Sequence, residues 1–155
     1  MIGLLPVATG LPFSIKTVEG TPLGMRRSSL LKEKIGRLSA EFMEGIFNHN
    51  YLSGSEGQDG CQLIARVEAP RTGRRVEVRS TYPAFQFFTP RFEHSLEGRP
   101  GENLAGFSGF AIEPQHVPNA PNNPLFPTSL LLCGQTFRQS IIYSFIPSYS
   151  RESGR

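Results

Sequence analysis

The sequence of 155 residues contains no tryptophan and only two cysteines, and charged residues make up just 19% of it. Neither Cys61 nor Cys133 has a second cysteine or a histidine at metal-ligand spacing, and two cysteines are too few for a disulfide framework. No apolar run approaches the ~20 residues that a membrane-spanning helix needs. Disulfide-rich, zinc-ribbon and helical membrane proteins are therefore not expected, while the redox state of the two cysteines stays open.

The charge balance is mildly basic, with a net charge of +3 and an isoelectric point of about 9.1. Positive residues cluster only at Arg71, Arg74, Arg75 and Arg79, and no aromatic residues interleave with them. On a strand–turn–strand, such a cluster is typical of a solvated face, and a nucleic-acid patch is the weaker interpretation. The first six residues lack the positive segment of a signal peptide. We therefore expect a cytoplasmic protein without nucleic-acid or membrane partners.

What the sequence does contain is 16 glycines, 13 prolines and 12 phenylalanines. Many short strands joined by tight turns produce this mixture, whereas a helical bundle does not. Alternating or continuous apolar patterns predict strands at residues 61–68, 74–81, 85–89, 107–113, 128–133 and 136–145. Residues 94–109 are polar and are expected to form a loop. The chain is thus expected to be all-β with hairpin connections.

One helix is predicted near residues 28–46, with Ser28 or Ser29 capping its start and Gly45 marking its end. Steps of three and four residues place five apolar side chains on one face of this helix: Leu31, Ile35, Leu38, Phe42 and Ile46.

Glu113 is the first candidate for chemistry. It ends an apolar stretch and is followed by Pro114, an arrangement that presents a carboxylate at a sheet edge or at the mouth of a cleft. Burial by Phe107, Phe110 and Ile112 would suit this carboxylate to act as a general base. The alternative is a strand-end glutamate that bonds to the amides of a loop.

Two amide-bearing segments are further candidates. Gln86 is the lone amide in the strand Phe-Gln-Phe-Phe, where it either faces solvent by simple alternation or bonds to hydroxyl groups. The stretch Asn-His-Asn-Tyr at 48–51 follows the predicted helix and is either a cap and turn or a hydroxyl-binding cluster. The three histidines, His49, His94 and His116, match no metal-ligand spacing, so no metal site is expected.

Taken together, these segments resemble the C-terminal part of the aldose 1-epimerase family. The resemblance runs from about residue 5 to 145 and is most specific around Glu113, which continues as Pro-Gln-His-Val-Pro-Asn-Ala-Pro-Asn. The other matching segments are the loop ending in Gly-Thr-Pro-Leu-Gly-Met-Arg, Asn-His-Asn-Tyr at 48–51, the hairpin and Gln-Phe strand at 67–89, and residues 126–145.

The resemblance implies a partial antiparallel β-sandwich of the galactose mutarotase-like supersandwich type over residues 1–146, followed by a polar tail at 147–155. It implies interconversion of the α and β anomers of a hexose such as glucose or galactose, without cofactor or metal. Under this resemblance Glu113 matches the general base and Gln86 a residue that bonds sugar hydroxyls. Asn48 stands where the family has an aspartate that binds a hydroxyl.

The sequence departs from the family pattern in ways that bear on activity. It matches only the later half of family members, and the catalytic acid, a histidine in a motif of the earlier half, has no counterpart here. Asn48 also lacks the charge of the aspartate that it replaces. We therefore expect weak or absent activity of this chain alone, with a non-catalytic carbohydrate-binding domain or an inactive remnant as the alternative. Exposed strand edges predict self-association.

Overall fold

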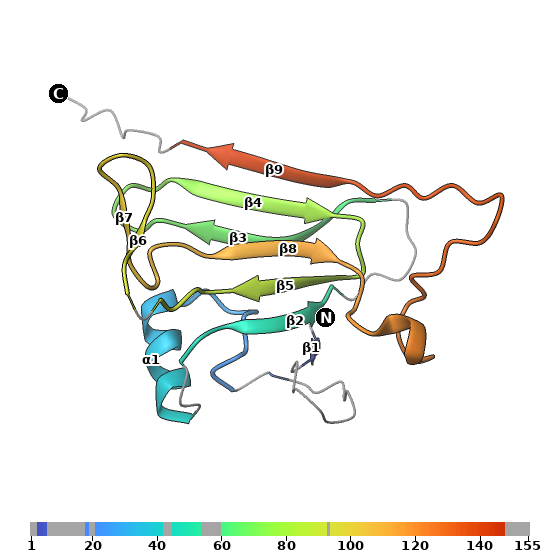
Figure 1. The fold of residues 1–155 in the computed structure, drawn as a ribbon, viewed down its shortest axis with the longest axis horizontal. Coiled ribbons are helices and arrows are strands. Elements are labelled where there is room, and N and C mark those ends of the chain that lie inside the picture. Colours follow the sequence, from blue (N-terminus) through green and yellow to red (C-terminus); the bar gives the residue numbers. More distant parts are fainter. Residues whose placement is uncertain are drawn as a thin grey trace.

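The computed structural model describes residues 3–5, 18, 21–41, 45–53, 60–92 and 94–147. Over this part of the chain the backbone forms two antiparallel sheets, a short hairpin and one α-helix (Figure 1). The first sheet contains, in spatial order, β1 (Gly3–Leu5), β2 (Asn48–Leu52), β5 (Ala84–Phe88) and β8 (Ala111–Gln115). The second sheet contains β3 (Gln62–Glu68), β4 (Arg75–Ser80) and β9 (Ile141–Ile146). The other elements are α1 (Leu31–Glu41), β6 (Leu96–Glu97), β7 (Asn103–Leu104) and a 3₁₀ turn (Ala120–Asn122).

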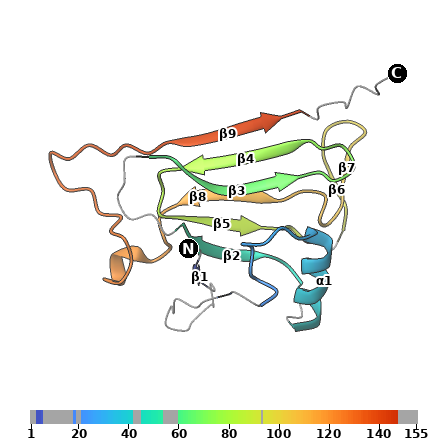
Figure 2. The ribbon, with the colours of Figure 1, turned by 180° about the vertical axis from the view of Figure 1, so that it is seen from behind.

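The main core lies between the two sheets, so the predicted β-sandwich architecture is confirmed. Tyr51, Phe85 and Phe87 of the first sheet and Ile64 and Val78 of the second belong to one buried cluster. Full burial of such side chains contributes about 1.5–3 kcal/mol each. The helix α1 lies at one end of the first sheet, beside β2, in both views (Figures 1 and 2).

The predicted helix is confirmed, but it is shorter than expected. Leu38 is 1% exposed and Leu31 and Ile35 pack against the same cluster, as the spacing predicted. The carbonyl of Leu30 accepts hydrogen bonds from the amides of Glu33 and Lys34, so neither predicted serine caps the start.

The C-terminal end of the predicted helix also differs. The helix extends to Glu41, and Ile46 lies outside it. Phe42 falls outside the described residues. Gly45 has a φ of 59°, a left-handed conformation that favours glycine.

Several strand boundaries differ from the prediction. The stretch 128–133 forms no strand, because its leucines 130, 131 and 132 are 64%, 56% and 63% exposed and nothing in the described chain covers them. The expected loop 94–109 contains the β6–β7 hairpin. The strand β8 continues through Pro114 to Gln115, which is possible because β8 is an edge strand and needs no hydrogen bonds on its outer side.

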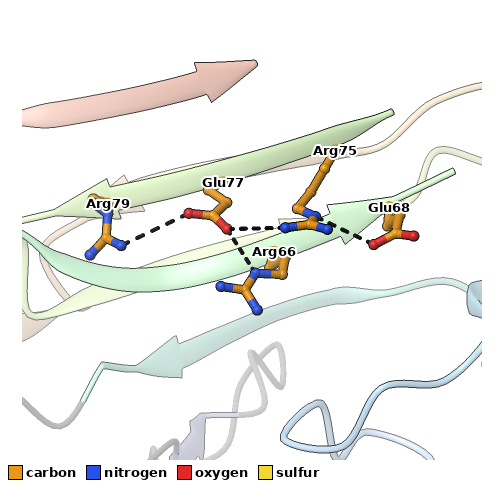
Figure 3. A network of polar contacts seen from close by, with 5 residues as sticks. All are labelled: Arg66, Glu68, Arg75, Glu77 and Arg79. Atoms are coloured by element: carbon orange, nitrogen blue, oxygen red, sulfur yellow. Dashed lines mark hydrogen bonds and ion pairs between the residues drawn. The ribbon is translucent and has the colours of Figure 1, made fainter. Parts of the chain in front are cut away.

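The outer face of the second sheet carries the charged residues of the hairpin, as expected for a solvated face. The carboxylate of Glu77 lies 2.9 Å from Arg66 Nε, 3.9 Å from Arg79 Nη2 and 4.0 Å from Arg75 Nη1 (Figure 3). Arg75 Nε also lies 3.3 Å from Glu68 Oε2. The side chains of Arg66, Arg75 and Arg79 are 55%, 36% and 42% exposed, whereas that of Glu77 is 13% exposed, so these ion pairs are partly screened by solvent and are expected to add only modestly to stability.

The strand β9 leaves apolar side chains uncovered. It pairs with β4 on one side and is the last strand of its sheet in the described chain. Register places Ile141, Tyr143 and Phe145 on the side of the buried Val78, yet these side chains are 41%, 47% and 76% exposed. In Figures 1 and 2 this strand forms one margin of the molecule. β9 is therefore an exposed strand edge of the kind from which self-association was predicted.

Both cysteines are free, and Cys133 is exposed. Among the described residues, no helix is both long and apolar enough to cross a membrane.

Candidate functional site

A row of polar side chains crosses the first sheet on the face that points away from the core. Register places Asn50 of β2 opposite Gln86 of β5, and Gln86 opposite Glu113 of β8. Because side chains alternate along a strand, Asn48 and Gln115 lie on this same face, two residues from Asn50 and Glu113. We call these five residues the polar row.

The aromatic residues between the polar ones fix this register. The rings of Tyr51 and Phe85 stack on the core side with centroids 5.3 Å apart. The Tyr51 hydroxyl donates a 2.9 Å hydrogen bond to the Leu23 carbonyl, and burial raises the pKa of this hydroxyl. A slip of one residue would turn the aromatic rings to the outside and bury the amides, so the hydrophobic pattern specifies which side chains form the row.

The four amides of the polar row are joined by hydrogen bonds. Gln86 Nε2 donates to Asn48 Oδ1 at 2.5 Å, and Asn50 Nδ2 donates to Gln86 Oε1 at 2.7 Å. Gln115 Nε2 donates to Asn50 Oδ1 at 2.9 Å. Gln86 is therefore held on both sides by asparagine side chains rather than being free in solvent.

Glu113 differs from its prediction in one respect. Its side chain is exposed, because Ile112 points to the opposite face of the strand, and Phe107 and Phe110 are themselves 40% and 41% exposed. The expected burial of the carboxylate by these residues is therefore wrong for this structure. Among the described residues, none donates a hydrogen bond to the Glu113 carboxylate, which leaves it accessible to a ligand.

The structure thus brings all three predicted site residues, Asn48, Gln86 and Glu113, onto one face. The stretch 48–51 is strand β2, so its interpretation as a cap and turn is wrong. The predicted site residues did not include Gln115, and Asn50 was included only as a member of the polar stretch 48–51. The available signal was spacing: each lies two residues from a predicted site residue, and so on the same face of its strand.

The histidines lie elsewhere. His49 is on the core side of β2, with its ring 6.4 Å from that of Phe47, and burial lowers its pKa. The ring of His116 packs between those of Tyr82 and Phe137, at centroid distances of 5.5 and 6.1 Å. Within the described residues, no group of three histidine, cysteine, aspartate or glutamate side chains could hold a metal ion.

The lowered pKa of His49 predicts a dependence of stability on pH. In the unfolded chain His49 binds a proton below about pH 6.5, whereas the folded chain resists protonation. His49 therefore leaves stability unchanged above that pH and reduces it as the pH falls toward the lower folded pKa. We expect His49→Phe to flatten the decline in urea midpoint between pH 6.5 and 5, with exposed His94→Gln as the control. An equally steep decline in both variants would contradict this assignment.

In the polar row Asn48 and Glu113 are exposed, Gln86 and Gln115 are half-buried and Asn50 is fully buried, so the row is partly open to solvent rather than an enclosed cavity. A hollow of about 470 Å³ is lined by His116 and by residues between 128 and 139, and it includes none of the polar row.

Comparisons with known proteins place this arrangement in a family. The aldose 1-epimerase family model matches residues 4–144. A galactose mutarotase from Bos taurus is 35% identical over 133 residues, which cover 84% of this chain and 37% of that protein. An aldose 1-epimerase from Escherichia coli is 27% identical over 146 residues, which cover 92% of this chain and 42% of that protein.

A crystal structure of an aldose epimerase homologue from C. elegans has the same fold. It matches with a TM-score of 0.75 at 24% sequence identity, over 95% of this chain and 44% of that one. The chain spans less than half the length of the relatives it matches. By its sequence match over residues 4–144, this chain belongs to the aldose 1-epimerase family.

Proposed function

We propose that this chain acts in the cytoplasm and carries the base-bearing part of a hexose mutarotase site, which lies on the polar row. The observation that carries the proposal is the register of β2, β5 and β8, which puts Glu113 beside Gln86 on one open face. Glu113 is the general base, and Gln86 and Asn48 bind sugar hydroxyls. Family membership supports these roles, since anomer interconversion is the reaction for which the family is named.

The chemistry follows from what a carboxylate and an amide can do. Glu113 takes the proton from the anomeric hydroxyl while an acid delivers a proton to the ring oxygen, so the bond between C1 and the ring oxygen breaks and an aldehyde forms. Rotation about C1–C2 then presents the other face of the aldehyde to the C5 hydroxyl. As the ring closes, that hydroxyl returns its proton to the acid and Glu113 gives its proton to the former carbonyl oxygen, so the anomer is inverted and both groups are restored. Amide side chains accept and donate hydrogen bonds but do not supply this acid. The acid must therefore come from outside the polar row.

A second candidate function is non-catalytic sugar binding. It is favoured by the composition of the row, in which four of the five side chains are neutral amides and none of these can act as the acid. Amides that donate and accept hydrogen bonds suit hydroxyl recognition equally well without any proton transfer.

Binding of a free hexose tests both candidates together. We expect titration with D-galactose or D-glucose to shift the side-chain amide NMR signals of Asn48, Gln86 and Gln115. Gln86→Ala should weaken binding by about tenfold, the loss of ~1.4 kcal/mol from hydrogen bonds. Gln62→Ala, which removes a half-buried glutamine from β3 in the second sheet, should not weaken it. Shifts confined to other surfaces, or none at all, would exclude the polar row as the sugar site.

A further inference from the structure

The three amide–amide hydrogen bonds of the polar row all run in one direction. Gln115 donates to Asn50, Asn50 donates to Gln86 and Gln86 donates to Asn48, in each case from nitrogen to oxygen. In such a chain each bond polarises the next, and reversing one amide would set nitrogen against nitrogen or oxygen against oxygen. The orientation of each amide is therefore tied to that of its neighbours.

Asn50 lies inside this series of hydrogen-bonded amides and cannot touch a ligand. Its side chain is 0% exposed, and its oxygen and its nitrogen each bond to a neighbouring amide. Leaving such a buried group without a partner costs about 1–3 kcal/mol, which opposes any rearrangement of the pair. Whatever Asn50 contributes to binding, it contributes through Gln86 and Gln115.

A small residue makes the bond between Gln115 and Asn50 possible. These residues lie on β8 and β2, two strands that β5 separates by about two strand spacings or ~9–10 Å, and register also offsets them by two positions along the strands. The residue of β5 paired with both Gln115 and Leu52 is Ala84, on the same face as Gln86. Ala84 is 0% exposed and carries only a methyl group, so a larger side chain there would compete with the Gln115 side chain for the space above β5.

The direction of these hydrogen bonds determines which donors and acceptors stay available to a ligand. Among the described residues, the Asn48 amide nitrogen donates no hydrogen bond, so the Asn48 end of the row presents hydrogen-bond donors. At the Gln115 end the amide oxygen accepts none, and it lies on the same strand and face as the Glu113 carboxylate. The row thus has donors on β2 and acceptors on β8, with the second N–H of Gln86 between them.

We propose that Asn50 and Gln115 are positioning residues, which hold Gln86 and Asn48 in one orientation for a free pyranose with adjacent hydroxyls. One hydroxyl of the sugar donates to Glu113, and another accepts from Asn48. Asparagine at 48 sets this polarity, because an aspartate there would offer only acceptors. The inference rests on the proposed sugar-binding function and adds to it the orientation of the amides that bind the sugar.

The test uses side-chain amide NMR signals with and without D-galactose. In the sugar-free protein we expect Gln115→Met to move the Gln86 side-chain amide signals and to speed their exchange with solvent. The matched control is Gln62→Met, another half-buried glutamine on an edge strand, which should leave those signals in place. Asn50→Leu should have the same effect as Gln115→Met, and the latter, at a less buried position, covers the case in which Asn50→Leu does not fold.

The same variants are then titrated with D-galactose. Gln115→Met should raise the dissociation constant about tenfold, and Gln62→Met should not. Unchanged Gln86 signals in Gln115→Met, or moved signals with unchanged affinity, would overturn the inference. If the proposed function is wrong, the wild type will not bind galactose. The sugar-free spectra still decide whether the hydrogen-bonded amides orient Gln86.

Discussion

Replacing Glu113 with glutamine is expected to lower the catalysed rate of hexose mutarotation by about 10²–10⁴-fold, the usual contribution of a positioned general base. Glutamine keeps the size of glutamate and its hydrogen bonds to hydroxyls, but it cannot accept the proton of the anomeric hydroxyl. Because Glu113 is exposed on an edge strand, the change should alter stability by no more than about 0.5 kcal/mol. The loss should therefore appear in the chemical step, with galactose binding retained.

Polarimetry of freshly dissolved α-D-galactose or α-D-glucose measures this rate directly. The matched control is Glu97→Gln, the same change at an exposed position of β6 outside the polar row. Catalysis above the buffer rate that persists undiminished in Glu113→Gln would rule out Glu113 as the base. Equal loss in both variants would point to a general effect of charge.

The largest effect on stability is expected for Phe47→Ala, at about 3–5 kcal/mol. Phe47 is 0% exposed, and its ring meets that of Phe87 at a centroid distance of 5.2 Å. Its backbone is fixed as well, since its amide donates to Thr89 Oγ1 and its carbonyl accepts from the Thr89 amide, both at 2.9 Å. The segment therefore cannot shift to fill the cavity that the substitution leaves.

Urea unfolding monitored by circular dichroism measures this loss. Phe145→Ala is the matched control, because the same ring is removed at a position that is 76% exposed, where the change should stay within about 0.5 kcal/mol. Similar midpoints for the two variants would mean that the aromatic cluster around Phe47 does not form the core in solution.

The sequence predicted where strands form better than it predicted which strands pair and in what register. Periods of two residues mark β3, β4 and β5 because alternation reflects one buried face, a property of each strand alone. The pairing of Gln86 with Glu113 depends on how β5 and β8 align across the β6–β7 hairpin, and alternation within either strand does not specify that alignment. The polar row could therefore be predicted as separate candidates but not as one set.

Two errors have physical causes that act beyond the local sequence. Asparagine is favoured both at helix ends and in turns, so a cap and turn was one of two interpretations of the stretch 48–51, whereas Tyr51 and Phe47 fix it as a strand of the sandwich. Residues 128–133 have the composition of a strand, yet they find no partner strand in the described chain. In both cases tertiary contacts, or their absence, override local preference.

The measurement that tests the central claim most directly is the mutarotation rate of α-D-galactose as a function of the concentration of this chain. With Glu113 as its base and no acid of its own, the polar row predicts a weak rate that rises linearly above the buffer rate, and a slope that Glu113→Gln removes. A wild-type rate equal to that of buffer at every protein concentration would contradict catalysis by this chain and leave sugar binding as the function of the polar row.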